Sequence, residues 1–137
     1  MIVALTGPIG SGKGEAALYL KEKGFQYLVY SDILREAAKQ QGIDPTRENL
    51  NKIGIHIKEH FHDPGYLSKS LLAKITQKDA IVDGVRNVGE IKELKKRKDA
   101  LIMGITAPQR LRFKRIVGRK REGDPITYRV FKKIDNL

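Results

Sequence analysis

The feature that most constrains this chain is a glycine-rich stretch near the N-terminus, GPIGSGKG at residues 7–14. It follows the apolar run of residues 2–5 and leads into an alanine- and leucine-rich segment, which predicts a strand, a loop and a helix in that order. The glycines allow backbone N–H groups to approach an anion, and the N-terminus of the following helix adds a partial positive charge. The sequence therefore predicts a phosphate-binding loop. The residues expected to contact a bound nucleotide are Gly7, Pro8, Ile9, Gly10, Ser11, Gly12, Lys13, Gly14 and Glu15.

Lys13 occupies the lysine position of the phosphate-loop pattern G-x-x-x-x-G-K-[ST]. From there its ammonium group can reach the outer phosphates of a nucleoside triphosphate, so we predict a catalytic role for it. One position departs from the pattern, because Gly14 stands where a Ser or Thr is expected. The alternative, a glycine-rich surface turn, is disfavoured because the stretch lies directly between a predicted strand and a predicted helix.

A chain of 137 residues is long enough for one domain with its own core, and we predict a single domain over residues 1–137. No apolar run approaches the roughly 18 residues that a membrane helix needs, and the first residues lack the charged leader of a signal peptide. We therefore expect a cytoplasmic protein that does not bind membranes. The absence of cysteine from the sequence excludes disulfides, cysteine-ligated zinc and iron–sulfur clusters.

The formal charge of +11 is unevenly distributed along the chain. Residues 86–133 contain 16 Lys and Arg against 5 Asp and Glu, and the rest of the chain is balanced. Such a basic half predicts a polyanionic partner, either a nucleic acid or ATP with a phosphorylated acceptor. We favour the small-molecule partner, because arginines gather at loop ends and aromatic residues do not alternate with the basic ones as they do in single-strand-binding grooves.

Beyond the loop, apolar runs alternate with amphipathic segments. Strands are predicted at residues 2–5, 25–30, 80–85 and 100–105. Helices are predicted from residue 15 onward and at 33–41, 45–61, 66–75, 88–97, 108–120 and 126–134, the second of them capped by Ser31 or Asp32. This alternation, with strands that are apolar throughout, indicates an α/β domain in which helices cover both faces of a parallel sheet.

Charged residues follow each predicted strand, at the edge of the sheet where α/β proteins bind ligands. Asp83 lies near the end of the third predicted strand and resembles the acid that holds Mg²⁺ through water in P-loop enzymes, although it could simply end the apolar part of the strand. Asp32 could equally be a helix cap, and Arg35 could belong to a solvated helix face. The other candidates for anion binding are Ser31 after the second strand, Arg86 after the third, and Arg110, Arg112, Arg115 and Arg119 after the fourth.

Several of these stretches resemble the P-loop nucleoside-monophosphate kinases and their dephospho-CoA-kinase-like relatives. Residues 5–13, LTGPIGSGK, with Gly24 and Phe25 before the second strand, are similar to the start of dephospho-CoA kinases, whereas Lys13-Gly14 is similar to the Gly-Lys-Gly-Thr of adenylate kinases. Residues 83–86, DGVR, resemble the Asp-Gly-Phe-Pro-Arg of adenylate kinases, and residues 115–119, RIVGR, resemble the Arg-x-x-Gly-Arg that enters their lid. The whole pattern is most similar to a little-characterised, adenylate-kinase-like group of AAA-type domains that occurs alone or fused to deoxycytidylate deaminases.

The resemblance implies a three-layer αβα fold of the P-loop NTPase type and a kinase that uses ATP and Mg²⁺. Its implied acceptor is a small nucleotide or nucleotide-like molecule, such as a (deoxy)nucleoside monophosphate or dephospho-CoA, and nucleic acid is not expected. Residues 31–35, SDILR, are similar to the Gly-Asp-x-x-Arg with which adenylate kinases hold the acceptor phosphate. The family pattern also implies an acceptor-binding helical region at about residues 33–76 and a short lid at about residues 112–128.

The resemblance further implies a role for each matching side chain. Arg35 and Arg86 would contact the acceptor phosphate, and Asp32 would lie near the acceptor hydroxyl with a catalytic role. Asp83 would hold Mg²⁺ through water, and Arg115 and Arg119 would close over the transferred phosphate as catalytic residues.

Two departures from the family pattern leave other functions open. Glu15 places a carboxylate where adenylate kinases have the hydroxyl that serves Mg²⁺, and a negative charge near phosphates lowers their affinity. The alternatives are therefore a catalytically weak, nucleotide-sensing regulatory P-loop domain and a nucleic-acid-binding P-loop protein. In the family a fifth strand follows the last helix predicted here, so we expect this chain to be truncated before the last strand of the sheet.

A further pattern, HIKEH at residues 56–60, fits the H-x-x-E-H of inverted zinc proteases. It places His56 and His60 one helical turn apart, with His62 nearby, but no distant carboxylate ligand can be identified. The histidines fall on the polar side of a predicted amphipathic helix. We therefore predict a solvated or acceptor-lining face rather than a zinc site.

Overall fold

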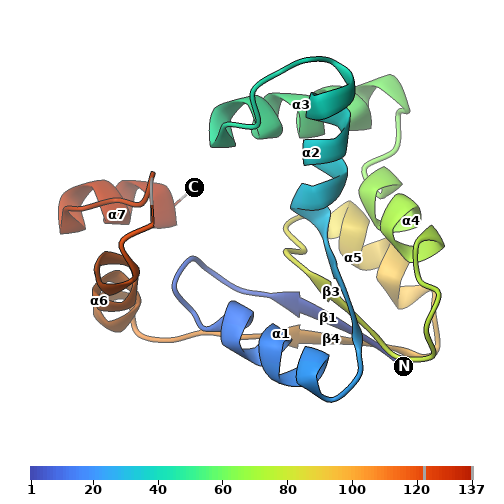
Figure 1. The fold of residues 1–137 in the computed structure, drawn as a ribbon, viewed down its shortest axis with the longest axis horizontal. Coiled ribbons are helices and arrows are strands. Elements are labelled where there is room, and N and C mark those ends of the chain that lie inside the picture. The colour runs from blue at the N-terminus through green and yellow to red at the C-terminus, as the bar shows by residue number, and fades with distance from the viewer. Residues whose placement is uncertain (122, 137) are drawn as a thin grey trace.

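A parallel sheet of four strands lies at the centre of the computed structural model, which describes residues 1–121 and 123–136 (Figure 1). The strands are β1 (Ile2–Thr6), β2 (Gln26–Val29), β3 (Ala80–Asp83) and β4 (Ala100–Gly104), in the order β2-β3-β1-β4. In β1, Ile2 lies opposite Ala80 of β3 on one side and Ala100 of β4 on the other. All of residues 2–5 are buried, because β1 has neighbouring strands on both sides and helices above and below it.

Seven helices accompany the sheet in the described part of the chain. They are α1 (Lys13–Glu22), α2 (Tyr30–Gln40), α3 (Arg47–His60), α4 (Tyr66–Ala73), α5 (Val88–Lys95), α6 (Gln109–Arg119) and α7 (Tyr128–Asp135). Each helix and strand expected from the sequence is present, with ends shifted by a few residues. The α/β fold with a parallel sheet is therefore confirmed.

Helices cover both faces of the sheet, because successive residues of a strand point to opposite sides. On one face, Val3, Leu5 and Ile81 pack against Ala17 of α1. On the other face, α2, α4 and α5 contribute the apolar side chains that contact the strands. This larger cluster contains Ile2, Ala4, Tyr30, Leu67, Leu71, Val82, Val85 and Leu94.

The last two helices, α6 and α7, lie together beside the loop that connects β1 to α1 (Figure 1). Their contact is aromatic: the ring centroid of Phe113 lies 5.3 Å from that of Tyr128 and 5.4 Å from that of Phe131. Phe131 is fully buried, so these two helices share a small apolar core of their own.

One predicted helix start is wrong. β2 ends at Val29 and α2 begins at Tyr30, so the residue that precedes the helix is Val29 rather than Ser31 or Asp32. Tyr30 is buried against the sheet and its phenol lies 2.5 Å from Oγ of Ser68. Burial of this side chain outweighs the usual preference for a Ser or Asp cap, because packing energies exceed the roughly 1 kcal/mol that a cap contributes.

Strand β4 lies at one edge of the sheet, and among residues 1–121 and 123–136 no fifth strand pairs with it. Its side chains are accordingly less covered than those of β1, and Leu101 and Met103 are 49% and 41% exposed.

Of the helices that the structure describes, none is both long enough and apolar enough to cross a lipid bilayer.

Candidate nucleotide-binding site

The loop between β1 and α1 can only be built with glycine at two positions. Gly7 has a φ of 146°, and a Cβ atom there would lie 2.0 Å from the carbonyl oxygen of Ile105. Gly10 has a φ of 75°, and its Cβ would lie 2.7 Å from the carbonyl oxygen of Arg112. The loop is thus pressed against neighbouring backbone from two directions, which fixes its shape before any ligand binds.

The N-terminus of α1 is open to an anion. Its N-cap is Gly12, which has no side chain to accept hydrogen bonds from the first N–H groups of the helix. These donors, and the positive end of the helix dipole, therefore remain available to a phosphate. This arrangement is the one predicted from residues 7–14.

Lys13 is half-buried over the loop, where its Nζ donates hydrogen bonds to the carbonyl oxygens of Gly7 at 2.7 Å and Pro8 at 3.4 Å. Burial lowers the pKa of Lys13, and the positive charges of Arg86 and Arg119 lower it further, while the carboxylate of Asp83 raises it. The ammonium group of Lys13 therefore interacts electrostatically with charged side chains at the end of β3 and at the end of α6. Three cations and one carboxylate share this site, which fits a bound polyanion.

Asp83 ends β3 and is buried, with only 9% of the residue exposed. Its Oδ2 accepts a hydrogen bond from the phenol of Tyr27 at 2.8 Å, whereas its Oδ1 has no hydrogen-bond partner among the described residues. A buried oxygen without a partner is costly unless a ligand, a water or an ion completes it. Carboxylate oxygens are the ligands that Mg²⁺ prefers, directly or through water, so these residues fit the predicted Mg²⁺ site.

Tyr27 was not predicted as a site residue, because in the sequence it is one of several aromatic and apolar residues of a strand. Burial raises the pKa of Tyr27, and the hydrogen bond to Asp83 and the charges of Asp83 and Asp32 raise it further. Asp32, in the first turn of α2, is therefore close enough to act on the phenol. A signal that could have revealed Tyr27 is its place in β2, the strand that neighbours β3 in the sheet.

The two arginines of the predicted lid are both held near the loop, in different ways. Arg115 donates from its Nη1 to the carbonyl oxygens of Gly10 at 3.3 Å and Ser11 at 3.2 Å, so its guanidinium lies on the loop itself. Arg119, one turn later on α6, forms an ion pair with both oxygens of Asp124, at 2.6 Å and 2.8 Å. The sequence did not predict a role for Asp124, because a single aspartate before Pro125 is typical of an ordinary turn.

Arg112 has a structural role, contrary to its inclusion among the anion-binding candidates. It is buried, and its guanidinium forms an ion pair with Asp135 of α7 and donates to the carbonyl oxygens of Ala107 at 2.9 Å and Ile9 at 3.2 Å. Because its N–H groups already donate to protein acceptors, Arg112 connects α6 to α7 and to the glycine-rich loop rather than binding an anion. Arg115 lies about one helical turn after Arg112, and this places its guanidinium on the surface of the loop while that of Arg112 is buried.

The predicted acceptor residues lie apart from one another. Asp32 and Arg35 are exposed on α2 and form an ion pair with each other at 2.6 Å, and Arg35 also donates to Oγ of Ser31 at 2.8 Å. Arg86 is exposed in the segment after β3, and its backbone N–H is held by Oε2 of Glu90 at 2.8 Å. Arg86 acts electrostatically on Lys13, whereas no hydrogen bond of the described residues joins Arg35 to the loop.

Comparison with known proteins places this chain in a family. Residues 6–130 match the family described as "AAA domain". The chain is 35% identical over 138 residues to the UPF0200 protein of Hyperthermus butylicus, covering 98% of this chain and 74% of that one. It is 37% identical over 127 residues to the UPF0200 protein of Sulfurisphaera tokodaii, covering 92% and 70%. The chain belongs to the UPF0200 family of AAA-domain proteins.

Solved structures share the fold of this UPF0200 protein. The crystal structure of TT1252 from Thermus thermophilus superposes with a TM-score of 0.64 at 16% identity and covers 99% of this chain and 78% of that one. A gluconokinase from Sinorhizobium meliloti 1021 superposes with a TM-score of 0.52 at 13% identity, covering 96% and 71%. The predicted P-loop, kinase-like fold is thus confirmed. The narrower resemblance to nucleoside-monophosphate and dephospho-CoA kinases stays a prediction.

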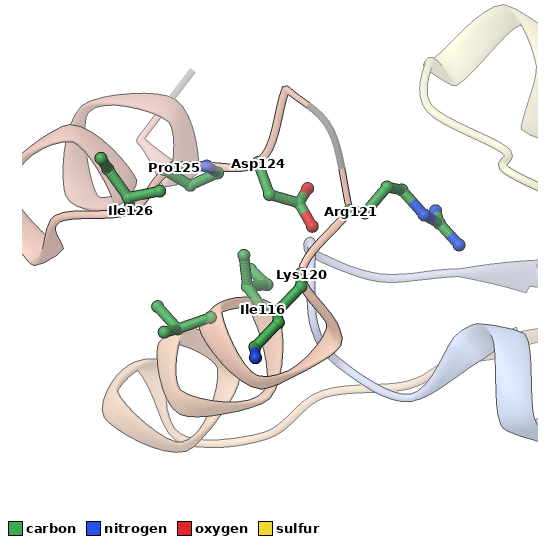
Figure 2. A pocket seen from close by; sticks show the side chains of 7 residues that line it. Ile116, Lys120, Arg121, Asp124, Pro125 and Ile126 are labelled. Atoms are coloured by element: carbon green, nitrogen blue, oxygen red, sulfur yellow. The ribbon is translucent and has the colours of Figure 1, made fainter.

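A cavity of about 360 Å³ opens in this UPF0200 protein between α6 and the turn that precedes α7 (Figure 2). None of residues 7–14 lines it, so we do not assign the phosphates to it. Asp124, the partner of Arg119, forms part of its wall, and Figure 2 shows Arg121 directed away from Lys120. The residues that line the cavity are Ile116, Val117, Lys120, Arg121, Asp124, Pro125 and Ile126.

The histidine pattern of the sequence lies on α3, away from the glycine-rich loop (Figure 1). The rings of His56 and His60 are stacked, with centroids 6.1 Å apart, and both residues are exposed. Within residues 1–121 and 123–136 no group of three or more His, Asp or Glu side chains is placed to hold a metal ion.

Proposed function

We propose that this UPF0200 protein is an ATP-dependent phosphotransferase whose acceptor is a small nucleotide or nucleotide-like molecule, such as a (deoxy)nucleoside monophosphate or dephospho-CoA. One observation carries the proposal: Lys13 lies on a preformed glycine loop, and the charges of Asp83, Arg86 and Arg119 act on it from β3 and α6. A kinase needs this set, because phosphoryl transfer depends on positioning and charge neutralisation more than on covalent help from the protein.

The donor side of the site consists of the loop, the start of α1 and Lys13. Backbone N–H groups of residues 7–14 bind the donor phosphates, and Lys13 exchanges its two carbonyl partners for phosphate oxygens. That exchange is favourable because a buried ammonium gains more from a charged acceptor than from a neutral carbonyl. Asp83 would hold Mg²⁺ through water, and the ion would supply positive charge that neutralises the phosphates.

The acceptor side of the site draws on the residues after β2 and β3. Arg86 lies near enough to Lys13 to change its pKa, so an acceptor phosphate bound by Arg86 is close to the donor phosphates. Arg35 adds a second cation. For an acceptor that reacts through a hydroxyl, such as dephospho-CoA, Asp32 accepts the hydroxyl proton as the oxygen attacks the donor phosphate. For this, the ion pair between Asp32 and Arg35 opens when the acceptor phosphate competes for the guanidinium.

Arg115 and Arg119 supply positive charge to the transferred phosphate. Arg115 already lies on the loop. Arg119 exchanges its ion pair with Asp124 for one with the phosphates, because these carry more negative charge than a single carboxylate. Arginines that serve in this way in other phosphotransferases are worth about 10³ to 10⁵ in rate.

The first prediction concerns Lys13. We expect Lys13→Ala to lower the rate of phosphoryl transfer by about 10³-fold or more while the thermal unfolding curve keeps its shape, because the side chain serves charge neutralisation rather than packing. The rate is measured by coupled ADP release with a panel of nucleoside monophosphates and dephospho-CoA. Lys21→Ala, on the exposed surface of the same helix, is the matched control and should retain full activity. Unchanged transfer by Lys13→Ala would refute the assignment.

A second candidate function, a nucleotide-sensing domain, is favoured by Glu15. This residue is exposed in the first turn of α1, where the related kinases have a hydroxyl, and its charge opposes phosphate binding. The same assay separates the two functions, because a sensor binds ATP without releasing ADP for any acceptor. Nucleic-acid binding would instead appear as affinity for DNA or RNA that falls steeply with salt.

A further inference from the structure

The phenol of Tyr27 connects β2 to the end of β3. It donates to Oδ2 of Asp83 at 2.8 Å, although in the register of the two strands Tyr27 lies opposite Ile81 and Asp83 lies opposite Val29. The contact is therefore diagonal, over the distance of about 7–8 Å that a long aromatic side chain can span. The ring of Tyr27 packs against the apolar cluster between the sheet and α1, which holds the phenol in place.

The two carboxylate oxygens of Asp83 are in different situations. Oδ2 has the phenol as its donor, and Oδ1 is buried without a hydrogen-bond partner among the described residues. Because the phenol is neutral, it orients the carboxylate without cancelling its negative charge, as a lysine or arginine would. The side chain that remains is a fixed, charged acceptor with one oxygen free, beside the ammonium group of Lys13.

We propose that Tyr27 is a positioning residue for Mg²⁺ binding: by holding Oδ2 of Asp83, it keeps Oδ1 free to accept a hydrogen bond from metal-bound water. This inference rests on the proposed function, since it needs a nucleotide bound with Mg²⁺. Groups that orient a metal-binding side chain through a hydrogen bond matter to the metal site, and their removal commonly lowers metal affinity by about 10- to 100-fold. Tyr27 thereby raises the affinity of the protein for ATP with Mg²⁺ relative to its affinity for ATP without Mg²⁺.

The test is Tyr27→Phe, which keeps the ring and its packing and removes only the hydroxyl. Isothermal calorimetry of ATP binding is carried out with Mg²⁺ in excess and again with EDTA in place of Mg²⁺. We expect the variant to bind ATP about 10-fold more weakly in Mg²⁺ and within about twofold of the parent chain in EDTA. Since both titrations use one preparation, partial unfolding would lower both affinities alike, and that result would overturn the inference.

The matched control is Tyr30→Phe, which removes the phenol of the next tyrosine along the chain. Tyr30 is buried and its hydroxyl lies against Ser68, on the opposite face of the sheet from α1. We expect this variant to unfold at lower temperature and to keep the full preference for ATP with Mg²⁺. An equal loss of that preference in both variants would show a general effect of tyrosine removal and would overturn the inference.

A double-variant cycle with Asp83→Asn completes the test. If Tyr27 acts through Asp83, then Tyr27→Phe should change the preference for Mg²⁺ by less than twofold in the Asp83→Asn background; an undiminished 10-fold effect there would contradict the inference. Failure of the proposed function is recognised separately. If the parent chain binds no ATP in either buffer, both proposals fall, whereas a parent chain that prefers ATP with Mg²⁺ and a Tyr27→Phe variant that keeps this preference would refute the inference alone.

Discussion

Glu15 is the residue whose charge fits a phosphate site least, and the first turn of α1 offers a reason for it. An acidic residue in this turn stabilises the helix through the helix dipole. In the proposed function the same position is close to the donor phosphates, and there the charge would be repulsive. The side chain is exposed, so solvent screens the repulsion and limits it to a modest penalty.

The second prediction follows from this opposition. We expect Glu15→Gln to bind ATP roughly three- to tenfold more tightly at about 20 mM salt and by a smaller factor at about 200 mM, because salt screens exposed charges. Calorimetric titration at the two salt concentrations measures the effect. Glu22→Gln, at the far end of the same helix, should leave affinity unchanged. Equal affinity of the Glu15→Gln variant and the parent at low salt would mean that the carboxylate turns away from the phosphates.

At the scale of elements, a buried ion pair joins α6 to α7. The side chains of Arg112 and Asp135 are 8% and 7% exposed, and Gln109 of α6 donates a further hydrogen bond to Asp135 at 2.9 Å. Since Arg112 also binds the carbonyl oxygen of Ile9, the pair fixes α7, α6 and the glycine-rich loop relative to one another. A buried pair of this kind is strongly destabilising when one partner is removed, because the other is left as an unpaired charge.

The third prediction is that Asp135→Asn lowers the free energy of unfolding by about 3 kcal/mol at pH 7. Urea denaturation followed by circular dichroism measures it. The matched control is Glu48→Gln, which breaks an exposed ion pair between Glu48 and Lys52 and should leave the midpoint unchanged. A midpoint for Asp135→Asn equal to that of the parent chain would show that the ion pair does not hold α6 and α7 together.

The same ion pair implies that the free energy of unfolding depends on pH in acid. The hydrogen bonds from Arg112 hold the pKa of Asp135 below its usual range, although burial alone would raise it. A carboxyl whose pKa is depressed on folding stabilises the protein above its unfolded pKa of about 3.9 and loses that contribution as the pH falls through the folded value. We therefore expect the difference in stability between the parent chain and Asp135→Asn to shrink below about pH 4. A difference that stays constant from pH 6 to pH 2 would contradict this assignment.

At the scale of the whole molecule, the site is assembled from segments far apart in the sequence. Lys13 follows β1, Asp83 ends β3 and Arg119 ends α6. The helices of the predicted acceptor region, α2, α3 and α4, lie to one side of the sheet (Figure 1). The hydrogen bond from Arg119 lowers the pKa of Asp124 in the turn after α6, and the charge of Arg47, at the start of α3, lowers it slightly further. The predicted lid and the predicted acceptor region therefore approach each other, as a site between them requires.

The last prediction is that ATP with Mg²⁺ raises the melting temperature of the whole chain. At a ligand concentration about 100 times the Kd, linkage gives about 2.7 kcal/mol, which corresponds to a rise of roughly 9 °C for a chain of this length. Differential scanning calorimetry measures the shift. Lys13→Ala should lose most of it and Lys21→Ala should retain it. A shift of the same size in Lys13→Ala would place the nucleotide elsewhere on the protein.

From the sequence alone follow the order of strands and helices along the chain and the glycine-rich loop, and the sequence predicts a site at the carboxyl ends of the strands. These features are local or periodic: apolar runs set the strands, and a loop that needs glycine at Gly7 and Gly10 shows in the spacing of residues. Asp83 and Lys13 are predicted as site residues in the same way, because Asp83 stands at the end of an apolar run and Lys13 within the glycine-rich pattern. The α/β class follows from the alternation itself.

Which side chains face one another depends on the packing of the elements and could not be predicted from the sequence. The tertiary structure assigned Arg112 to a buried ion pair and Arg115 to the loop surface, gave Arg119 the partner Asp124, began α2 at Tyr30, and brought the phenol of Tyr27 to Asp83. The physical reason is that these outcomes depend on how helices rotate and strands align when they pack. A sequence pattern fixes the period of an element, whereas burial against the neighbouring elements fixes its orientation.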